Sequence, residues 1–162
     1  SHLIARGARR IAFIGGPNHL DMVKRRKHGY LEALRDHRLP IDRDLVLCGK
    51  IDFDEARQAT LQLLQSEKRP DAILAFNDII TYAAFDAIKA CGLRIPDDVA
   101  IIGFTDGDSA AFVTPKLSAI MDQAHEQGFK SCELLLRHIG GDQHIYREII
   151  PMILKIRESS EK

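Results

Sequence analysis

Polar side chains that could bind a small molecule stand directly behind two apolar runs of the sequence. Asn77 and Asp78 follow the first run, and Thr105, Asp106 and Asp108 follow the second. An Asn amide both donates and accepts hydrogen bonds, and a carboxylate accepts them from hydroxyl groups, so this set suits a polyol ligand. A structural role stays open, because Asn and Asp are preferred helix caps and an Asp-Gly pair is typical of a turn.

A basic run, Lys24-Arg25-Arg26-Lys27, adds cations near the start of a predicted helix. Runs of this kind usually form a solvated face. At this place in the chain, one member could instead point into a crevice. An Arg fork there would hydrogen-bond sugar hydroxyls or a carboxylate.

The sequence offers little support for catalysis. Asp106 and Asp108 could form an acid/base pair or a cation site, but no third acidic ligand, Ser-His-Asp order or HExxH motif accompanies them. Gly15-Gly16-Pro17 follows an apolar run as a phosphate loop does, yet it matches neither nucleotide motif, and Pro17 lacks a backbone donor. We therefore expect no catalytic residue, no cofactor and no metal.

Four strand–helix units position these residues. Apolar runs begin near Arg10, Leu45, Ala72 and Val99, and the segments between them carry apolar residues at helical spacing. Runs without polar alternation are typical of strands buried on both faces, so the pattern predicts a doubly wound parallel α/β sheet with helices on both faces. In such sheets, ligands bind at the carboxyl ends of the strands, which is where the polar residues stand.

Helices are predicted over residues 21–36, over residues 54–66 and from residue 78 to Gly92. The first helix is expected to bury Met22, Tyr30, Leu31 and Leu34.

The regular alternation of strands and helices ends after Gly103. A polar loop over 104–115 leads to a short strand over 117–121, a helix over 123–139 and two extended segments over 146–150 and 152–157. The helix carries one apolar stripe, made of Phe129, Cys132, Leu135, Leu136 and Ile139.

Composition limits the classes of partner. The 162 residues suffice for one α/β domain, and 23 Lys and Arg balance 23 Asp and Glu. A neutral chain without a basic excess is not expected to grip DNA by itself. Cys48, Cys91 and Cys132 lie far apart within apolar sequence, which predicts reduced thiols in a cytosolic protein. We expect no signal peptide and no membrane span, because no apolar run of the sequence is long enough to cross a bilayer.

Four stretches together resemble the regulatory domain of the LacI–GalR family of bacterial transcription regulators. They are HLIARGARRIAFIGGP, the Arg of KRRKHGYLEAL, RPDAILAFNDIITYAAFDAIKACGLRIPDDVAIIGF and TPKLSAIMDQAHEQGFKSCELLL. They run across nearly the whole chain in unbroken order. The combination AFND…A…GLRIPDDVAIIGF…P.L is a specific signature of the family.

The resemblance implies a periplasmic-binding-protein fold of two lobes, preceded in family members by a helix-turn-helix and a hinge helix. Residues 1–162 would then be a fragment of the effector-binding domain that lacks the helix-turn-helix and most of the first lobe. Residues 10–103 would form the second-lobe sheet, residues 116–150 would return to the first lobe, and residues 151–157 would form the final crossing strand.

The resemblance also implies an effector site in the cleft between the lobes, where family members bind a sugar, a nucleoside or a purine. Arg26 matches the Arg of the helix after the first strand of this lobe. Asn77 matches the Asn that ends the third strand, and Asp122 matches a cleft-facing position of the returning segment.

Two positions depart from the family pattern. Thr105 stands where the family usually has Asp, with Asp106 next to it, and Thr is a weaker acceptor than a carboxylate. Ile51 stands where an aromatic residue often stacks on the ligand, so it offers apolar contact without a π-face. Both departures bear on the identity of the effector.

By similarity, dimer contacts would come from Tyr82, Ser109, Phe112 and Val113. For Tyr82 and Phe112, a place in the ordinary core is the alternative.

These expectations combine into one functional prediction. The chain would be the effector-sensing domain of a cytoplasmic, homodimeric LacI-type regulator, whose small-molecule effector shifts its affinity for operator DNA. Only the missing helix-turn-helix would contact DNA, and no membrane contact is expected. One alternative is a sugar-binding protein of a transport system with the same fold, and another is an enzyme on a doubly wound sheet.

Overall fold

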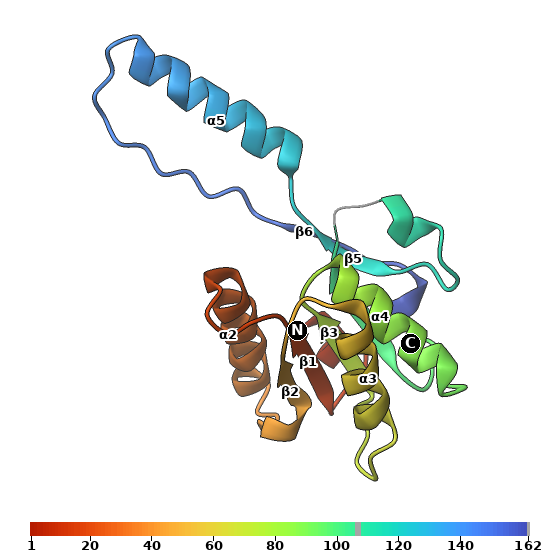
Figure 1. Cartoon of the computed structure of the whole chain (residues 1–162). Helices are drawn as coiled ribbons and strands as arrows, with labels where there is room; N and C mark the ends of the chain where they lie inside the picture. Colours follow the sequence, from red (N-terminus) through yellow and green to blue (C-terminus); the bar gives the residue numbers. More distant parts are fainter. Residues whose placement is uncertain (106–107, 162) are drawn as a thin grey trace.

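A computed structural model describes residues 1–105 and 108–161 of the chain, apart from the side chain of Asp108 (Figure 1). At its centre lies a six-stranded sheet with the strand order β2-β1-β3-β4-β5-β6. The strands are β1 (Ile11–Gly15), β2 (Val46–Cys48), β3 (Ala72–Ala75), β4 (Ala100–Phe104), β5 (Ser118–Met121) and β6 (Ile153–Lys155). The first five run parallel, and β6 pairs antiparallel with β5. The predicted parallel α/β sheet is confirmed.

Helices cover both faces of this sheet. Helix α2 (Asp21–Asp36) lies on one face, whereas α3 (Phe53–Leu64) and α4 (Asp78–Ala90) pack side by side on the other (Figure 1). The chain begins with the short α1 (His2–Ala5). Gly7 follows it at a φ of 97°, a left-handed conformation that glycine adopts without strain.

The strands divide their side chains between two apolar clusters, one on each face. Ile73 and Ile101 share a cluster with Ile80 and Ile88 of α4, and all four are fully buried. Strands that are apolar on both faces need a helix on each, which is the physical reason for the doubly wound arrangement.

The other cluster joins α2 to β1. The rings of Phe13 and Tyr30 stack with centroids 5.5 Å apart, and the Tyr30 hydroxyl donates to the Ile11 carbonyl at 2.8 Å. Burial, with a smaller contribution from the charge of Asp42, raises the pKa of Tyr30 to about 12. The cluster therefore contains a neutral, hydrogen-bonded phenol.

The predicted core of α2 needs one correction. Tyr30 and Leu34 are buried and Leu31 packs against the same cluster, as expected. Met22 is 55% exposed, so its prediction was wrong, and the neighbouring Val23 is fully buried in its place. Met22 instead borders an open apolar groove of about 550 Å³ between α1, α2 and the sheet.

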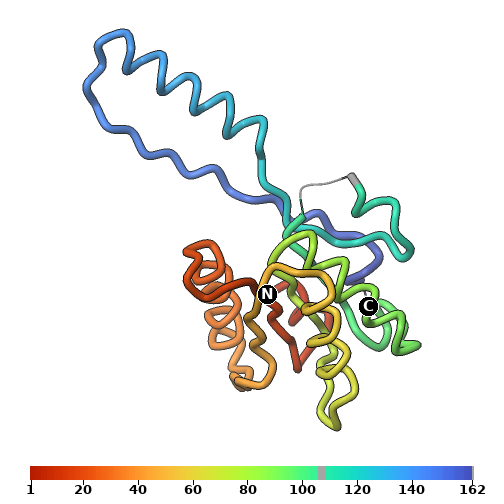
Figure 2. Tube along the Cα trace, in the orientation of Figure 1, coloured from red at the N-terminus to blue at the C-terminus, as the bar shows by residue number. Residues whose placement is uncertain are grey.

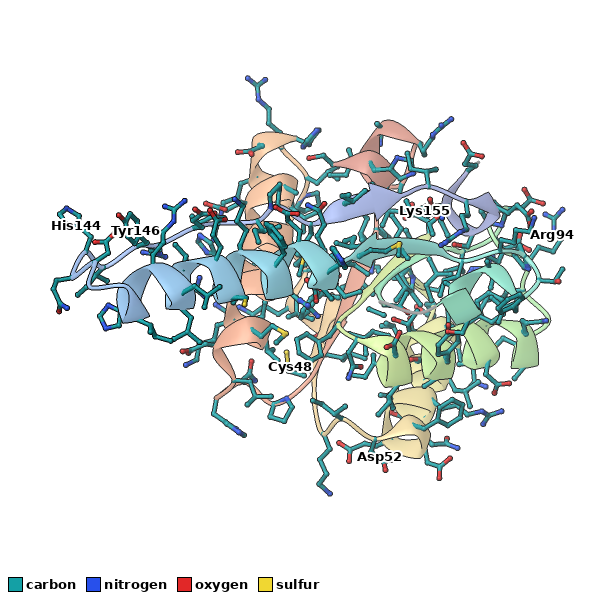
Figure 3. All side chains as sticks on the ribbon, turned by 90° about the horizontal axis from the view of Figure 1, so that it is seen from above. Cys48, Asp52, Arg94, His144, Tyr146 and Lys155 are labelled. Carbon is teal, nitrogen blue, oxygen red and sulfur yellow. The ribbon has the colours of Figure 1, made fainter. Side chains whose placement is uncertain are left out.

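β5 and β6 lead into an arm, residues 124–151, that stands away from the sheet. Helix α5 (Ala124–Ile139) forms one side, and residues 140–151 run back beside it to β6 (Figures 1 and 2). Of the two predicted extended segments, only the second contains a strand. The first, over 146–150, runs beside a helix whose main-chain groups are already paired. His144 and Tyr146 lie at the far end of the arm (Figure 3).

The apolar stripe of α5 faces solvent. The helix buries none of its residues, and Phe129, Leu135, Leu136 and Ile139 are 58–72% exposed. The spacing that predicted an amphipathic helix is present. The assignment of residues 116–150 to a returning segment stays a prediction.

Buried serine hydroxyls fasten the segment after β6 to the sheet. Ser159 Oγ donates to the Ile101 carbonyl at 2.7 Å and accepts from the Ser118 N–H at 2.8 Å. Ser160 Oγ donates to Ser118 Oγ at 2.7 Å, and His2 Nε2 lies 3.0 Å from Ser160 Oγ. Residues far apart in the sequence are thus joined at the same place beside β5.

Gly103 allows α4 to approach β4 closely. A Cβ on this residue would lie 2.2 Å from Thr81 Oγ1 and 2.3 Å from Thr81 Cγ2. Thr81 is fully buried, and its hydroxyl donates to the Asn77 carbonyl at 2.6 Å. Neither side of this contact can yield without moving the helix.

We expect Gly103→Ala to lower the free energy of unfolding by about 1–3 kcal/mol, because the added methyl group forces α4 away from the sheet. Gly29→Ala is the matched control, since its Cβ would meet nothing within 4 Å and its site lies inside α2. That change should raise the free energy by about 0.5–1 kcal/mol. Urea unfolding followed by circular dichroism measures both, and an unaltered midpoint for Gly103→Ala would contradict the packing.

Candidate functional site

The carboxyl ends of the parallel strands carry a row of side chains that we call the carboxyl edge. Because parallel strands end on the same side of a sheet, side chains from separate parts of the sequence meet there. The carboxyl edge consists of Gly16, Arg26, Ile51, Phe76, Asn77, Phe104, Thr105 and Asp122.

Arg26 reaches this edge from α2 and is held by two aromatic rings. Its Cζ lies 3.9 Å from the centroid of the Phe104 ring and 5.0 Å from that of Phe76. Its Nη1 donates to the Phe76 carbonyl. Lys24 and Arg25 of the same basic run are exposed, whereas Arg26 is half-buried against the two rings. Cation–π contact and a main-chain acceptor together restrict the guanidinium to one place.

Asn77 caps α4 with its own side chain. Its Oδ1 accepts a hydrogen bond from the Ile80 N–H at 3.0 Å. Of the two residues that could cap this helix, Asn77 takes the role, because Asp78 is the exposed first residue of the helix. With Oδ1 engaged by the cap, the NH₂ group is the part of the amide that would donate to a ligand at this edge.

Ile51 and Phe76 form an apolar patch over Gly16. A Cβ on Gly16 would lie 3.0 Å from Ile51 Cγ1 and 3.3 Å from Phe76 Cε1, so both side chains rest on this glycine. Ile51 is 37% exposed and Phe76 only 4%. The patch places hydrocarbon beside the donors of Arg26 and Asn77, an arrangement that suits a ligand with both polar and apolar faces.

The structure describes two of the three residues predicted to accept hydrogen bonds from the ligand, Thr105 and Asp122. Thr105 is 2% exposed, and its N–H donates to the Ile120 carbonyl at 3.2 Å, so its hydroxyl lies behind the exposed surface. Asp122 follows β5 and is half-buried. Asp106 lies outside the described residues. Direct contact of these three side chains with an effector stays a prediction.

The edge presents hydrogen-bond donors and hydrocarbon side chains. Across residues 1–105 and 108–161, no group of three or more His, Cys, Asp or Glu side chains could hold a metal ion. The free thiol of Cys48, at the end of β2, has its pKa raised by burial, against a smaller opposing effect of Lys27. A thiol with a raised pKa is a poor nucleophile at neutral pH. No helix in the described part of the chain is long and apolar enough to cross a membrane.

The predicted dimer residues come from α4 and from the segment after β4. The Tyr82 hydroxyl and Ser109 Oγ are 2.7 Å apart. Phe112 is 83% exposed, so the alternative of a core position was wrong for this residue. Tyr82 and Val113 are half-buried against the α4 cluster. Whether they contact a second copy stays a prediction.

Two aromatic residues of the site, Phe76 and Phe104, were not predicted from the sequence. A signal was present, because each is an aromatic residue that ends an apolar run directly before a polar candidate, Asn77 or Thr105. Side chains of neighbouring strand ends lie close together, so an aromatic pair there can enclose a cation from the covering helix.

The cap and the amide donor can be separated by substitution. Asn77→Ala removes the acceptor for the Ile80 N–H and should lower the free energy of unfolding by about 0.5–2 kcal/mol. Asn77→Asp keeps an acceptor at the positive end of the helix dipole, so its stability should stay within about 0.5 kcal/mol of the parent. Thermal unfolding followed by circular dichroism compares the two. Equal losses would show that the cap is not the structural role of Asn77.

Comparisons with known proteins agree with this geometry. The family described as the periplasmic binding protein-like domain matches residues 1–160. The HTH-type transcriptional repressor PurR of Aliivibrio salmonicida is 33% identical over 151 residues, which cover 93% of this chain and 45% of that repressor.

Solved structures give the same result. A regulatory protein of the LacI family from Chloroflexus aggregans matches with a TM-score of 0.92 and 37% identity, over 98% of this chain and 58% of that one. The transcriptional regulator CelR, solved as a cellobiose complex, matches with a TM-score of 0.87 and 32% identity, over 97% and 48% of the two chains. The present chain therefore spans about half the length of the proteins it matches.

Proposed function

The chain belongs to the periplasmic-binding-protein-like family in the form found in LacI-type regulators, and from this premise we propose that it senses the effector of a transcription regulator. The observation that carries the proposal is the position of Arg26. Two aromatic rings and a main-chain carbonyl hold it at the carboxyl edge. The residues beside it have the chemistry of a binding site.

The edge suggests what the effector offers in return. Arg26 and the amide of Asn77 both donate hydrogen bonds, so the part of the effector that meets them carries acceptor oxygens or nitrogens. Ile51 lies close by and covers an apolar face, such as the C–H groups of a sugar ring. Asp122, Asp106 and Thr105 are the candidates for accepting from effector hydroxyls. A sugar or a nucleoside-like molecule meets these requirements.

The arm supports a two-lobed mechanism. β5 and β6 join the carboxyl edge to α5, whose apolar stripe faces solvent. We place a second lobe against this stripe, so that an effector between the lobes would favour one closure state. An effector that binds the closed and open states unequally shifts their populations and thereby couples to DNA binding.

Dimer formation and DNA contact belong to the same proposal. Tyr82, Ser109, Phe112 and Val113 would pair with the same residues of a second copy, as a two-fold interface requires. Phe112 is 83% exposed. Phosphate contacts would come from a helix-turn-helix outside this sequence, since the chain itself is neutral. A regulator of this kind works in the cytoplasm.

The rival functions have less support. PurR and CelR are regulators of transcription, which favours this role over that of a sugar-binding transport protein. An enzymatic role has no comparable support, since both of these relatives are named as regulators.

Full-length protein tests the proposal with a panel of purines, nucleosides, monosaccharides and disaccharides. We expect at least one compound to raise the melting temperature, since binding to the folded state alone stabilises by about 2.7 kcal/mol at a hundred times the Kd. The same compound should change the affinity for a duplex selected from random DNA, measured by fluorescence anisotropy. Asn77→Asp should weaken calorimetric binding at least about tenfold, because it replaces donors by a carboxylate.

Two controls accompany this test. One is the melting temperature of Asn77→Asp, and the other is Arg147→Ala, a substitution of an exposed residue in the arm. Both variants should melt close to the parent, and Arg147→Ala should bind the compound normally. The proposal fails if no compound binds, or if a bound compound leaves the DNA affinity unaltered.

A further inference from the structure

Arg26 is a long and flexible side chain that must be held in place before it can recognise anything. An arginine loses rotamer freedom when it forms a directed hydrogen bond, and a site that fixes it beforehand avoids that loss on binding. The guanidinium of Arg26 is half-buried and lies over two rings, those of Phe76 and Phe104. The two rings differ in what else they contact.

Phe76 is a core residue as well as a partner of Arg26. It is 4% exposed, belongs to the apolar cluster beneath α4 and rests on Gly16. Its carbonyl also accepts from Arg26 Nη1, a contact that needs no aromatic ring. A substitution here would disturb the core and the arginine together.

Phe104 has a more restricted set of contacts. It is the last residue of β4, is half-buried and belongs to neither apolar cluster. Phe104 lines the open groove beside α2, and its ring centroid lies 3.9 Å from Arg26 Cζ, closer than that of Phe76. At this distance the negative face of the ring attracts the cation, an interaction that an aliphatic side chain cannot provide.

We propose that Phe104 is the positioning residue for Arg26, and that effector affinity depends on an aromatic ring at this place. The inference rests on the proposed function for its ligand-binding consequence, whereas the holding of Arg26 can be measured without any ligand. Phe104 need not touch the effector. It acts by keeping the guanidinium at the edge, so that the hydrogen-bonding plane of the arginine is already fixed.

Three variants of the full-length protein separate positioning from bulk. Phe104→Leu removes the π-face and keeps an apolar side chain, Phe104→Tyr keeps the ring, and Arg26→Lys removes the planar fork. Relaxation of the Arg26 Nε–H by ¹⁵N NMR is the direct measurement. We expect an ordered side chain in the parent and in Phe104→Tyr, and a disordered one in Phe104→Leu.

Calorimetry with cellobiose, D-galactose, adenosine and guanine supplies the second measurement. For any of these that binds the parent, Phe104→Leu should weaken binding about tenfold, equivalent to about 1.4 kcal/mol, and Phe104→Tyr should restore it. In the Arg26→Lys background, Phe104→Leu should weaken binding little further, because the effect of Phe104 passes through Arg26. A purely structural role of Phe104 would instead give losses that add. Melting temperatures close to the parent confirm that each variant is folded.

The outcomes keep the two proposals apart. An Arg26 side chain as ordered in Phe104→Leu as in the parent overturns the positioning role, whatever the four compounds do. An additive double mutant, or binding unaffected by Phe104→Leu, overturns it as well. If none of the four binds while Phe104→Leu releases Arg26, the positioning role stands and the effector-sensing function loses support.

Discussion

The close contact between α4 and β4 is the constraint on which the carboxyl edge depends. Thr81 fits over Gly103, where any side chain would collide with it, and its hydroxyl is bound to the Asn77 carbonyl. The start of α4 is therefore fixed relative to β4, and Phe104 is the next residue of that strand. The place of Arg26 between the ends of β3 and β4 therefore depends on the packing of α4 against β4, although Arg26 itself belongs to α2.

This constraint explains how one residue can serve both the fold and the site. Asn77 Oδ1 accepts the hydrogen bond that caps the helix, and its NH₂ group is the part that would donate to a partner outside the helix. The cap fixes the amide in one orientation, so the structural role prepares the binding role. Arg26 is prepared in a related way, by the rings and by the Phe76 carbonyl. Under the proposed function, both donors would be held in place before a ligand binds.

The sheet and its helices could be predicted from the sequence, because unbroken apolar runs and helical spacing depend only on local residue order. The wrong predictions concern neighbouring residues of similar type, where a shift of one position along the helix decides which of the two is the cap or is buried. Asn77 and Asp78 are equally good caps, and only the helix start chooses between them. Met22 and Val23 are similarly ambiguous, and the open groove decides which is buried.

Burial of a residue by partners far away in the chain could not be predicted from the sequence. Thr105 is buried beside β5, whose Ile120 carbonyl accepts from the Thr105 N–H, a pairing that no local pattern encodes. The stripe of α5 was predicted from its spacing, but spacing says only that a helix has an apolar face. Which surface covers that face depends on the rest of the fold.

The difference between the rigid edge and the exposed arm bears on how an effector could act. A side chain that is already fixed contributes affinity without changing shape, so the contacts of Arg26 and Asn77 alone would not distinguish one closure state from another. Discrimination must come from groups whose distance to the edge changes. In this chain those groups lie beyond β5 and β6, on the side of the arm, where α5 carries an apolar surface that its own sheet does not cover. Under the proposed function, the edge would set which molecule binds, and the arm's position would determine what the binding changes.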